Sequence, residues 1–144
     1  MPISVEKIES GTVIDHIEAG RGLKVLEVLG VKDDFGSRVA LVMNVPSKTM
    51  GKKDIVKIEG KFIDDKTADM IALISPKATI NIVKKSEVSE KRNVRMPKSV
   101  QGILKCPNPK CITNFEKIAT EFGVEERGLR CGFCERVFEA EELI

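Results

Sequence analysis

The chain lacks tryptophan and tyrosine, and it contains a single histidine among its 144 residues. Histidine is the side chain most often used for acid–base catalysis near neutral pH, so this composition removes much of the usual catalytic material. No convincing set of catalytic groups is left. We therefore expect the chain to have no enzymatic activity of its own.

Long apolar runs and targeting signals are also missing. The longest apolar stretches, such as residues 39–45, are far shorter than the roughly 20 residues that span a bilayer. Residues 1–10 are mixed and charged, unlike a secretory signal. We expect a cytoplasmic protein without a membrane partner. Its apolar residues, 42% of the chain, are sufficient for a packed core.

Charge and cysteine content divide the chain into two segments. Residues 1–100 carry 18 Lys and Arg against 14 Asp and Glu, whereas residues 101–144 carry 6 against 8. All four cysteines lie in the second segment. The connecting residues 84–97 are polar and end in a proline, which is typical of a domain boundary. We expect domains at 1–97 and 98–144.

The first segment alternates β-branched runs with stretches of helical spacing. Asp64 or Asp65 is a candidate cap for the second helix, which Pro76 would end, and Pro46 would close the second strand. We expect strands at 12–17, 38–45, 53–59, 79–83 and 87–94, and helices at 23–30 and 64–75. This order predicts an α+β domain with a ferredoxin-like antiparallel sheet, two helices and one extra strand. Both helices would cover one face, leaving the other face or an edge for a second copy.

The charged residues of this segment permit two interpretations. His16 follows Asp15 within a predicted strand, so the two side chains should point to opposite faces, and a lone histidine is more often structural than functional. Lys53 and Lys57 share one face of the next strand. Such lysines are either solvated charge that protects an edge or part of a pocket for a phosphorylated ligand. No glycine-rich phosphate loop is present, so composition leaves both interpretations open.

The four cysteines form two close pairs, Cys106-x4-Cys111 and Cys131-x2-Cys134, which are 19 residues apart. Two such turns are typical of a small β-rich domain built around a structural zinc ion with four cysteine ligands. Iron is the main competing metal, and the spacing is also compatible with two disulfides or four unrelated core thiols. An intracellular chain disfavours disulfides, and a thin core of about 44 residues needs a metal to fold. We predict one zinc ion without an open ligand position.

A zinc domain also raises the alternative of a nucleic-acid-binding protein. Four thiolates and one Zn²⁺ would add a charge of −2 to a segment that already carries −2, and such a domain repels phosphates. We expect its phenylalanines, Phe115, Phe122, Phe133 and Phe138, to pack around the metal turns. Contact with another protein is therefore favoured over nucleic acid. A small metalloenzyme is disfavoured because no histidine accompanies the cysteines.

Five motifs occur in an order and spacing that resemble a known family. The chain is similar to the regulatory chain of aspartate carbamoyltransferase over about residues 5–138. The motifs that carry the resemblance are residues 11–17 (GTVIDHI), 50–59 (MGKKDIVKIE), 78–81 (ATIN), 106–112 (CPNPKCI) and 131–135 (CGFCE). Each motif alone is weak, but five in order are specific.

The resemblance implies a function and partners. The first domain would bind nucleoside triphosphates, with CTP inhibiting and ATP opposing it in feedback control of pyrimidine biosynthesis. The zinc domain would dock on a catalytic chain. Homodimers of regulatory chains would bridge catalytic trimers.

The resemblance also implies the residues of the nucleotide site. His16 and Lys91 would contact the triphosphate, and Asp15 and Lys57 would lie near the ribose. The backbone around Ile8 and Ser86 would read the base edge, although Ser86 stands where the family can have a larger aromatic residue. The remaining lining would come from Val5, Glu6, Val13, Asn81 and Val88.

Overall fold

The computed structural model describes residues 9–31 and 35–143. The chain divides into two compact units, Met1–Arg95 and Met96–Ile144. Of the residues predicted for a nucleotide site, Val5, Glu6 and Ile8 lie outside the described residues.

The first unit is built on one five-stranded sheet in the order β2-β3-β1-β4-β5. All neighbouring strands pair antiparallel. The strands are β1 (Gly11–Glu18), β2 (Val39–Ser47), β3 (Gly51–Glu59), β4 (Thr79–Lys84) and β5 (Glu87–Asn93). The predicted α+β architecture, with a ferredoxin-like sheet and one additional strand, is confirmed.

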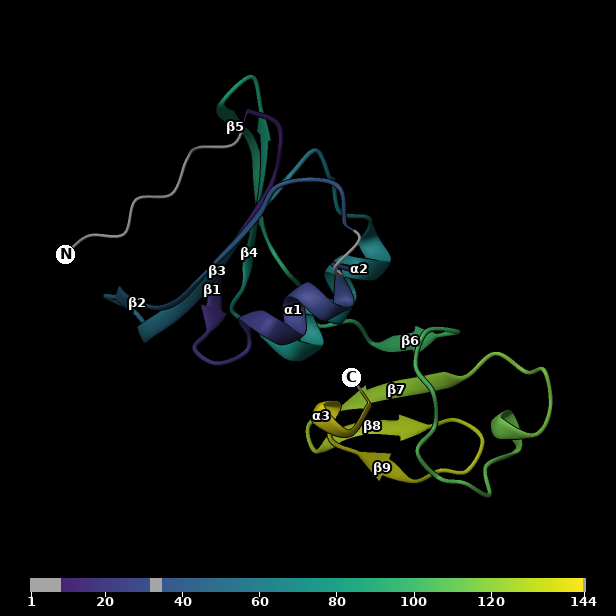
Figure 1. Ribbon diagram of the computed structural model, residues 1–144. Helices are drawn as coiled ribbons and strands as arrows, with labels where there is room; N and C mark the ends of the chain where they lie inside the picture. Colours follow the sequence, from purple (N-terminus) through teal and green to yellow (C-terminus); the bar gives the residue numbers. More distant parts are fainter. Residues whose placement is uncertain (1–8, 32–34, 144) are drawn as a thin grey trace. The chain divides into compact units, whose positions relative to one another are not determined.

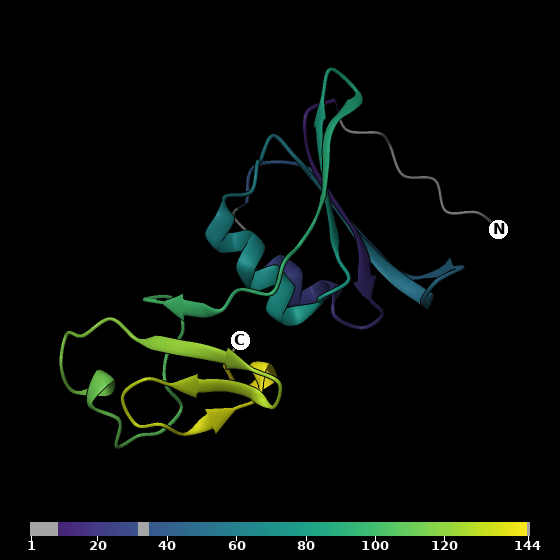
Figure 2. The same ribbon diagram turned by 180° about the vertical axis from the view of Figure 1, so that it is seen from behind.

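Two helices, α1 (Gly22–Val28) and α2 (Asp65–Ile74), lie on the same side of this sheet (Figures 1 and 2). Asp64 caps α2, because its Oδ1 accepts a hydrogen bond from the backbone N–H of Thr67 at 2.8 Å. The core between helices and sheet consists of aliphatic side chains. The strands contribute chiefly Ile14, Ile17, Val56, Ile58 and Ile80. The helical side contributes Val25 from α1, Leu29 just after α1, and Ile71 from α2. The opposite face of the sheet therefore carries no helix from the described part of this unit.

Pro46 does not close the second strand, as the sequence suggested, because β2 continues to Ser47. Pro46 pairs with Lys52 of β3. The strand lies at the edge of the sheet, where a proline without an N–H can point its nitrogen away from the ladder.

The predicted alternation of Asp15 and His16 is wrong, because β1 is interrupted there by a bulge. The register between β1 and β3 shifts between Ile14 and Ile17, and His16 has a positive φ of 56°. Its Nδ1 lies 3.9 Å from Oδ2 of Asp15. A bulge adds a residue to one strand and redirects its side chain, so the two groups lie close together rather than on opposite faces.

The second unit contains a four-stranded antiparallel sheet in the order β6-β7-β8-β9. Its elements are β6 (Ser99–Gln101), the 3-10 turn η1 (Ile112–Asn114), β7 (Glu121–Glu125), β8 (Gly128–Cys131), β9 (Val137–Phe138) and α3 (Ala140–Leu143). The buried core is small and centres on Phe122, Leu129, Val100 and Leu104. Within residues 9–31 and 35–143, no helix combines the length and apolar composition that crossing a bilayer requires.

Candidate functional site

The four cysteines of the second unit converge on one point. Sγ of Cys106 lies 3.7 Å from Sγ of Cys134, and Sγ of Cys111 lies 3.8 Å from Sγ of Cys131. All four sulfur atoms lie within 4.8 Å of one another. A zinc ion bound at about 2.3 Å by four thiolates places its ligands about 3.8 Å apart. The cluster therefore suits one structural zinc ion held by four cysteines.

These sulfur distances also exclude disulfides among the described thiols, because a disulfide requires about 2.05 Å. All four cysteines are free, and three of them are buried. Four protein ligands complete the tetrahedron, so a bound zinc ion would stabilise the fold and present no open position to a substrate.

Local hydrogen bonds shape the first metal turn. The backbone N–H of Cys111 donates to the carbonyl of Asn108 at 3.0 Å. The Asn114 amide donates to the carbonyls of Cys106 at 3.1 Å and of Asn108 at 2.8 Å. These contacts fix the backbone between Cys106 and Cys111, so both sulfur atoms are held ready for the metal.

The second metal turn is held by the neighbouring strand and by an arginine. The Gly132 N–H donates to the carbonyl of Glu121 in β7 at 2.7 Å, and the Glu135 N–H donates to the carbonyl of Cys131 at 2.9 Å. The Arg130 guanidinium donates to the Glu135 carbonyl at 2.8 Å. Glu135 adopts a positive φ of 63°, which lets the chain reverse directly after the last ligand.

The electrostatic surroundings of the thiols differ. Burial raises the pKa of the Cys106 thiol to about 12 and also raises the pKa of Cys131. A hydrogen bond from the Thr113 hydroxyl lowers the pKa of Cys111. Burial opposes ionisation of Cys134, but hydrogen bonds led by the Arg136 N–H outweigh it and lower its pKa to about 7. A metal ion would supply the positive charge that keeps all four as thiolates.

The prediction that the phenylalanines of this unit pack around the metal turns is only partly correct. Phe122 is fully buried, but Phe115 is 72% exposed and Phe133 is 42% exposed. Ile112 is also exposed, at 50%. The metal turns therefore present apolar groups at the surface of this unit.

In the first unit, strand register brings together four of the residues predicted for a nucleotide site. Lys57 of β3 stands opposite Val13 of β1, Val13 stands opposite Asn81 of β4, and Asn81 stands opposite Lys91 of β5. Directly opposed residues of antiparallel strands share one face. We call Lys57, Val13, Asn81 and Lys91 the cross-strand row. Three strand spacings make it roughly 14 Å wide.

The cross-strand row lies on the face of the sheet that carries no helix in the described residues. Its sequence neighbours Ile14, Val56 and Ile80 point into the core beneath the helices. Arg92, next to Lys91, reaches Asp65 of α2 at 3.4 Å, which assigns the opposite face to Lys91. The row therefore presents two ammonium groups and one amide on an open surface.

A second polar group lies beside the row, around the β1 bulge. Nδ1 of His16 lies 3.0 Å from the Thr79 hydroxyl, and the Lys53 ammonium lies 3.0 Å from Oδ1 of Asp15. Burial raises the pKa of the Asp15 carboxyl, but hydrogen bonds from Lys53 and from the His16 N–H outweigh it, so the pKa lies below its ordinary value. Asp15, His16 and the row thus belong to one surface of the sheet.

The predicted Ser86 and Val88 come from the hairpin between β4 and β5. Ser86 has a positive φ of 64°, and its backbone N–H donates to the carbonyl of Glu9 at 2.8 Å. Val88 pairs with Val83 and is exposed. This hairpin therefore lies beside the chain that enters β1.

Two charged residues of β3 have structural roles that the sequence pattern did not reveal. Lys53 was recognised only as sharing a face with Lys57, although its bond to Asp15 joins it to the polar surface. Asp54 is fully buried and accepts backbone hydrogen bonds from Gly20, Gly22 and Asn44. The sequence did contain a signal for this burial. Asp54 alternates with Val56 and Ile58 along the strand, so this spacing places its carboxylate on the same, core-facing side as these apolar residues.

Comparisons with known proteins cover both units. Residues 3–95 match the family model described as aspartate carbamoyltransferase regulatory chain, allosteric domain. Residues 98–144 match the model described as the metal binding domain of the same chain.

Individual relatives carry the same description over nearly their full lengths. A chain from Pyrococcus horikoshii named aspartate carbamoyltransferase regulatory chain is 51% identical over 146 residues, which cover 99% of this chain and 96% of the relative. A chain of that name from Saccharolobus islandicus is 51% identical, covering 97% of this chain and 91% of its own length. A third, from Thermococcus kodakarensis, is 48% identical, covering 98% and 95%. With a four-cysteine metal domain following a ferredoxin-like sheet, and with relatives of this similarity, the chain belongs to the family of aspartate carbamoyltransferase regulatory chains.

Proposed function

We propose that this chain binds CTP and ATP through residues 1–97 and docks on the catalytic chain of aspartate carbamoyltransferase through residues 98–144. As a regulatory chain it is a non-catalytic subunit. In the proposed assembly, homodimers of this chain bridge catalytic trimers in the cytoplasm and adjust pyrimidine biosynthesis by feedback.

The cross-strand row is the observation that carries the nucleotide-binding part of the proposal. A nucleoside triphosphate carries several negative charges, and the row presents the ammonium groups of Lys57 and Lys91 on one open face. Lys91 would face the triphosphate with His16 as a hydrogen-bond partner, and Lys57 and Asp15 would lie nearer the ribose. The hairpin that holds Ser86 and Val88, beside the chain entering β1, supports a base site at that end of the sheet.

The exposed apolar side chains of the second unit support the docking part of the proposal. Phe115, Phe133 and Ile112 leave apolar surface around the metal turns, and exposed apolar side chains that gather on one unit are typical of contact with another protein. The zinc ion would act only by fixing these turns. Loss of the metal should therefore release the chain from the catalytic trimers and leave the trimers active.

The edge of the first sheet supports the homodimer. Strand β2 is an outer strand of that sheet and pairs on one side with β3. An outer strand leaves backbone donors and acceptors available to a second chain, and natural proteins usually protect such an edge.

The nucleotide site is tested by comparing Lys91→Ala with Lys84→Ala. Both changes remove one lysine from the β4–β5 hairpin, but the Lys84 ammonium lies 5.7 Å from the centre of the Phe62 ring, outside the cross-strand row. A hydrogen bond to a charged group contributes about 1.5–3 kcal/mol, so Lys91→Ala should weaken CTP binding roughly 10-fold to 150-fold. Lys84→Ala should change it little in the same calorimetric titration.

The reassembled enzyme supplies the second measurement. Because allosteric coupling is reciprocal, Lys91→Ala should blunt the effect of subsaturating CTP on the catalytic chains. Activity without nucleotide should stay the same. Equal CTP affinities in the two variants would contradict the position assigned to the nucleotide.

A further inference from the structure

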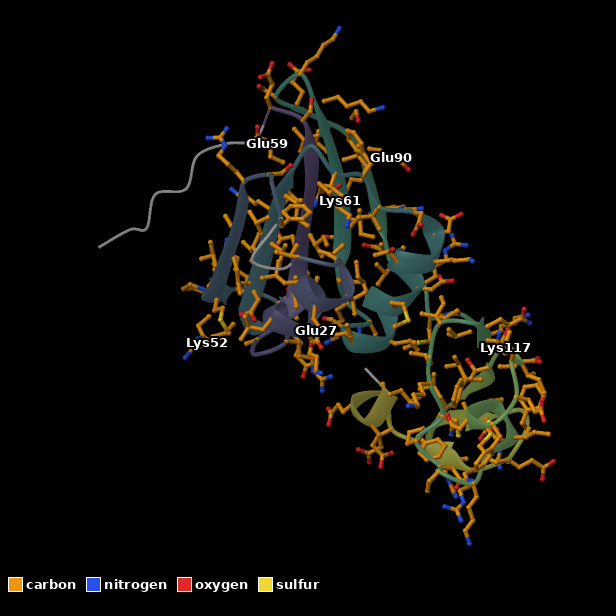
Figure 3. All side chains as sticks on the ribbon, turned by 45° about the vertical axis from the view of Figure 1, so that its right-hand side comes forward. Glu27, Lys52, Glu59, Lys61, Glu90 and Lys117 are labelled. Atoms are coloured by element: carbon orange, nitrogen blue, oxygen red, sulfur yellow. The ribbon has the colours of Figure 1, made fainter. Side chains whose placement is uncertain are left out.

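A cavity lies away from the cross-strand row, at one end of the same sheet. It has a volume of about 620 Å³ and is formed by the end of β1, the hairpin between β2 and β3, and the turn between α2 and β4. Pockets for small molecules have volumes of roughly 300–1,000 Å³. In Figure 3, Lys52 marks this end of β3 and Glu59 marks the other.

Hydrogen bonds fasten the segments that form this cavity. The backbone N–H of Glu18 donates to the Ser75 hydroxyl oxygen at 2.9 Å, which ties the end of β1 to the turn after α2. The Arg21 guanidinium donates to the carbonyl of Ile74 at 3.2 Å. The Gly20 N–H donates to Oδ2 of Asp54 at 3.0 Å, which anchors the turn between β1 and α1 to β3. The cavity is thus formed before any ligand arrives, which lowers the cost of binding.

The lining of the cavity combines positive charge with hydroxyl groups. Lys52 comes from the start of β3 and Lys77 from the turn between α2 and β4, so lysines from two different segments line the cavity. Ser75 and Thr49 add hydroxyls. Ser75 is buried at the base of the cavity and accepts from Glu18 through its oxygen, which leaves its O–H as a donor. Lysines and hydroxyls together are typical ligands of a phosphate group.

The rest of the lining suits the uncharged, hydroxylated part of a phosphorylated ligand. Met50 and Pro76 supply apolar surface, and the Glu18 carboxylate can accept hydrogen bonds from hydroxyl groups. The charge of Glu18 is partly offset by Arg21, whose Nε lies 3.4 Å away. A phosphate therefore meets a net positive lining, while sugar-like hydroxyls have an acceptor.

We propose that this cavity is a second binding site, which takes a small phosphorylated sugar. Its phosphate lies between Lys52 and Lys77, and its hydroxylated body packs against Met50 and Pro76. The site is distinct from the proposed nucleotide site. Val13 of the row and Glu18 of the cavity are five residues apart on β1, a separation of roughly 15 Å. Lys52 also points away from Lys53, which binds Asp15 on the face of the row.

The test uses the full zinc-loaded chain and ribose 5-phosphate as the probe, measured by calorimetry beside free ribose and inorganic phosphate. We expect saturable binding of ribose 5-phosphate at least tenfold tighter than either fragment. Lys52→Ala combined with Lys77→Ala should weaken it at least tenfold. A matched variant, Lys66→Ala with Lys117→Ala, removes two exposed lysines outside the cavity and should bind within about twofold of the parent chain.

Two further measurements locate the ligand. Ribose 5-phosphate should protect Lys52 and Lys77 from chemical acetylation, read by mass spectrometry. Lys91→Ala, which weakens the proposed nucleotide site, should leave its affinity unchanged, so failure of one site is distinguishable from failure of the other.

Three results would overturn the proposal. The first is equal affinity in the Lys52/Lys77 double variant and its matched control. The second is loss of ribose 5-phosphate binding in Lys91→Ala, which would assign the ligand to the row. The third is affinity for inorganic phosphate equal to that for ribose 5-phosphate, which would remove the sugar from the assignment.

Discussion

Asp54→Asn should destabilise the first unit severely although the change removes no bulk. The Asp54 side chain is fully buried on the core side of β3. Its Oδ2 accepts from the N–H groups of Gly20 and Gly22 at 3.0 and 2.9 Å, and its Oδ1 accepts from Asn44 at 3.0 Å. Asn44 lies in a bulge of β2, where the register with β3 shifts between Val42 and Val45. One carboxylate therefore joins the β1–α1 turn and the β2 bulge to β3.

The magnitude follows from counting donors and acceptors. An asparagine can turn its carbonyl oxygen toward Gly20 and Gly22, but its amide NH₂ then faces the N–H of Asn44, donor against donor. The Asn44 N–H loses its acceptor and the buried NH₂ of the new side chain gains none, which costs about 1–3 kcal/mol, and the two remaining bonds lose their charge assistance. We expect a loss of about 2–4 kcal/mol, or roughly 10–30 °C in Tm for a unit of this size.

The matched control is Asp65→Asn, the same substitution at a side chain that is 94% exposed and 3.4 Å from Arg92. An exposed ion pair contributes about 0–1 kcal/mol. Because the chain has neither tryptophan nor tyrosine, unfolding is best followed by far-UV circular dichroism with zinc retained. The two longer helices both belong to the first unit, so the helical signal reports on it. If both variants melt within a few degrees of each other, the carboxylate does not hold these segments.

Three further changes test other parts of the structure. Removal of zinc by a chelator, or the substitution Cys131→Ser, should unfold residues 96–144 because the small core of the second unit depends on the metal. The helical circular dichroism signal of the first unit should remain. Protection of the second unit from hydrogen exchange without metal would contradict this. Glu135 has a left-handed backbone conformation (φ 63°), which costs about 1–2 kcal/mol and which Glu135→Gly would relieve. Zinc transfer from this variant to a chromogenic chelator should therefore be slower. Faster transfer would show that the glutamate stabilises the turn. The pKa of Asp15 lies below its ordinary 3.8, so its contribution to stability is complete above that pH and is lost as the pH falls through the lower folded-state value. Asp15→Asn should flatten the acid limb of the stability–pH curve below about pH 4, whereas an unchanged acid limb would mean that the Lys53 bond adds nothing.

The sequence alone determined the features that depend on local pattern. Alternating β-branched runs located the five strands, and Asp64 or Asp65 was correctly identified as the cap of α2. The spacing of the cysteine pairs predicted the metal cluster, because a tight turn brings two sulfur atoms together whatever the rest of the chain does. Motif order was enough to identify the family.

Other features arose only from pairing between segments distant in the sequence. The cross-strand row joins Lys57, Val13, Asn81 and Lys91 because three separate strand registers align them, and no local pattern fixes a register. The β1 bulge reversed the expected orientation of His16, since its extra residue is defined only against β3. Pro46 continues its strand because β2 lies at an edge, which the order of strands in the sheet decides.

The burial of Asp54 and the exposure of Phe115 have the same physical origin. A carboxylate is stable in this core only because three backbone N–H groups converge on it, and these come from a turn and a bulge of the folded chain. Phe115 is exposed because the folded chain places it outside the core around Phe122 and Leu129. Polarity states what a side chain prefers, but the partners and the space that satisfy this preference exist only once the whole chain has folded.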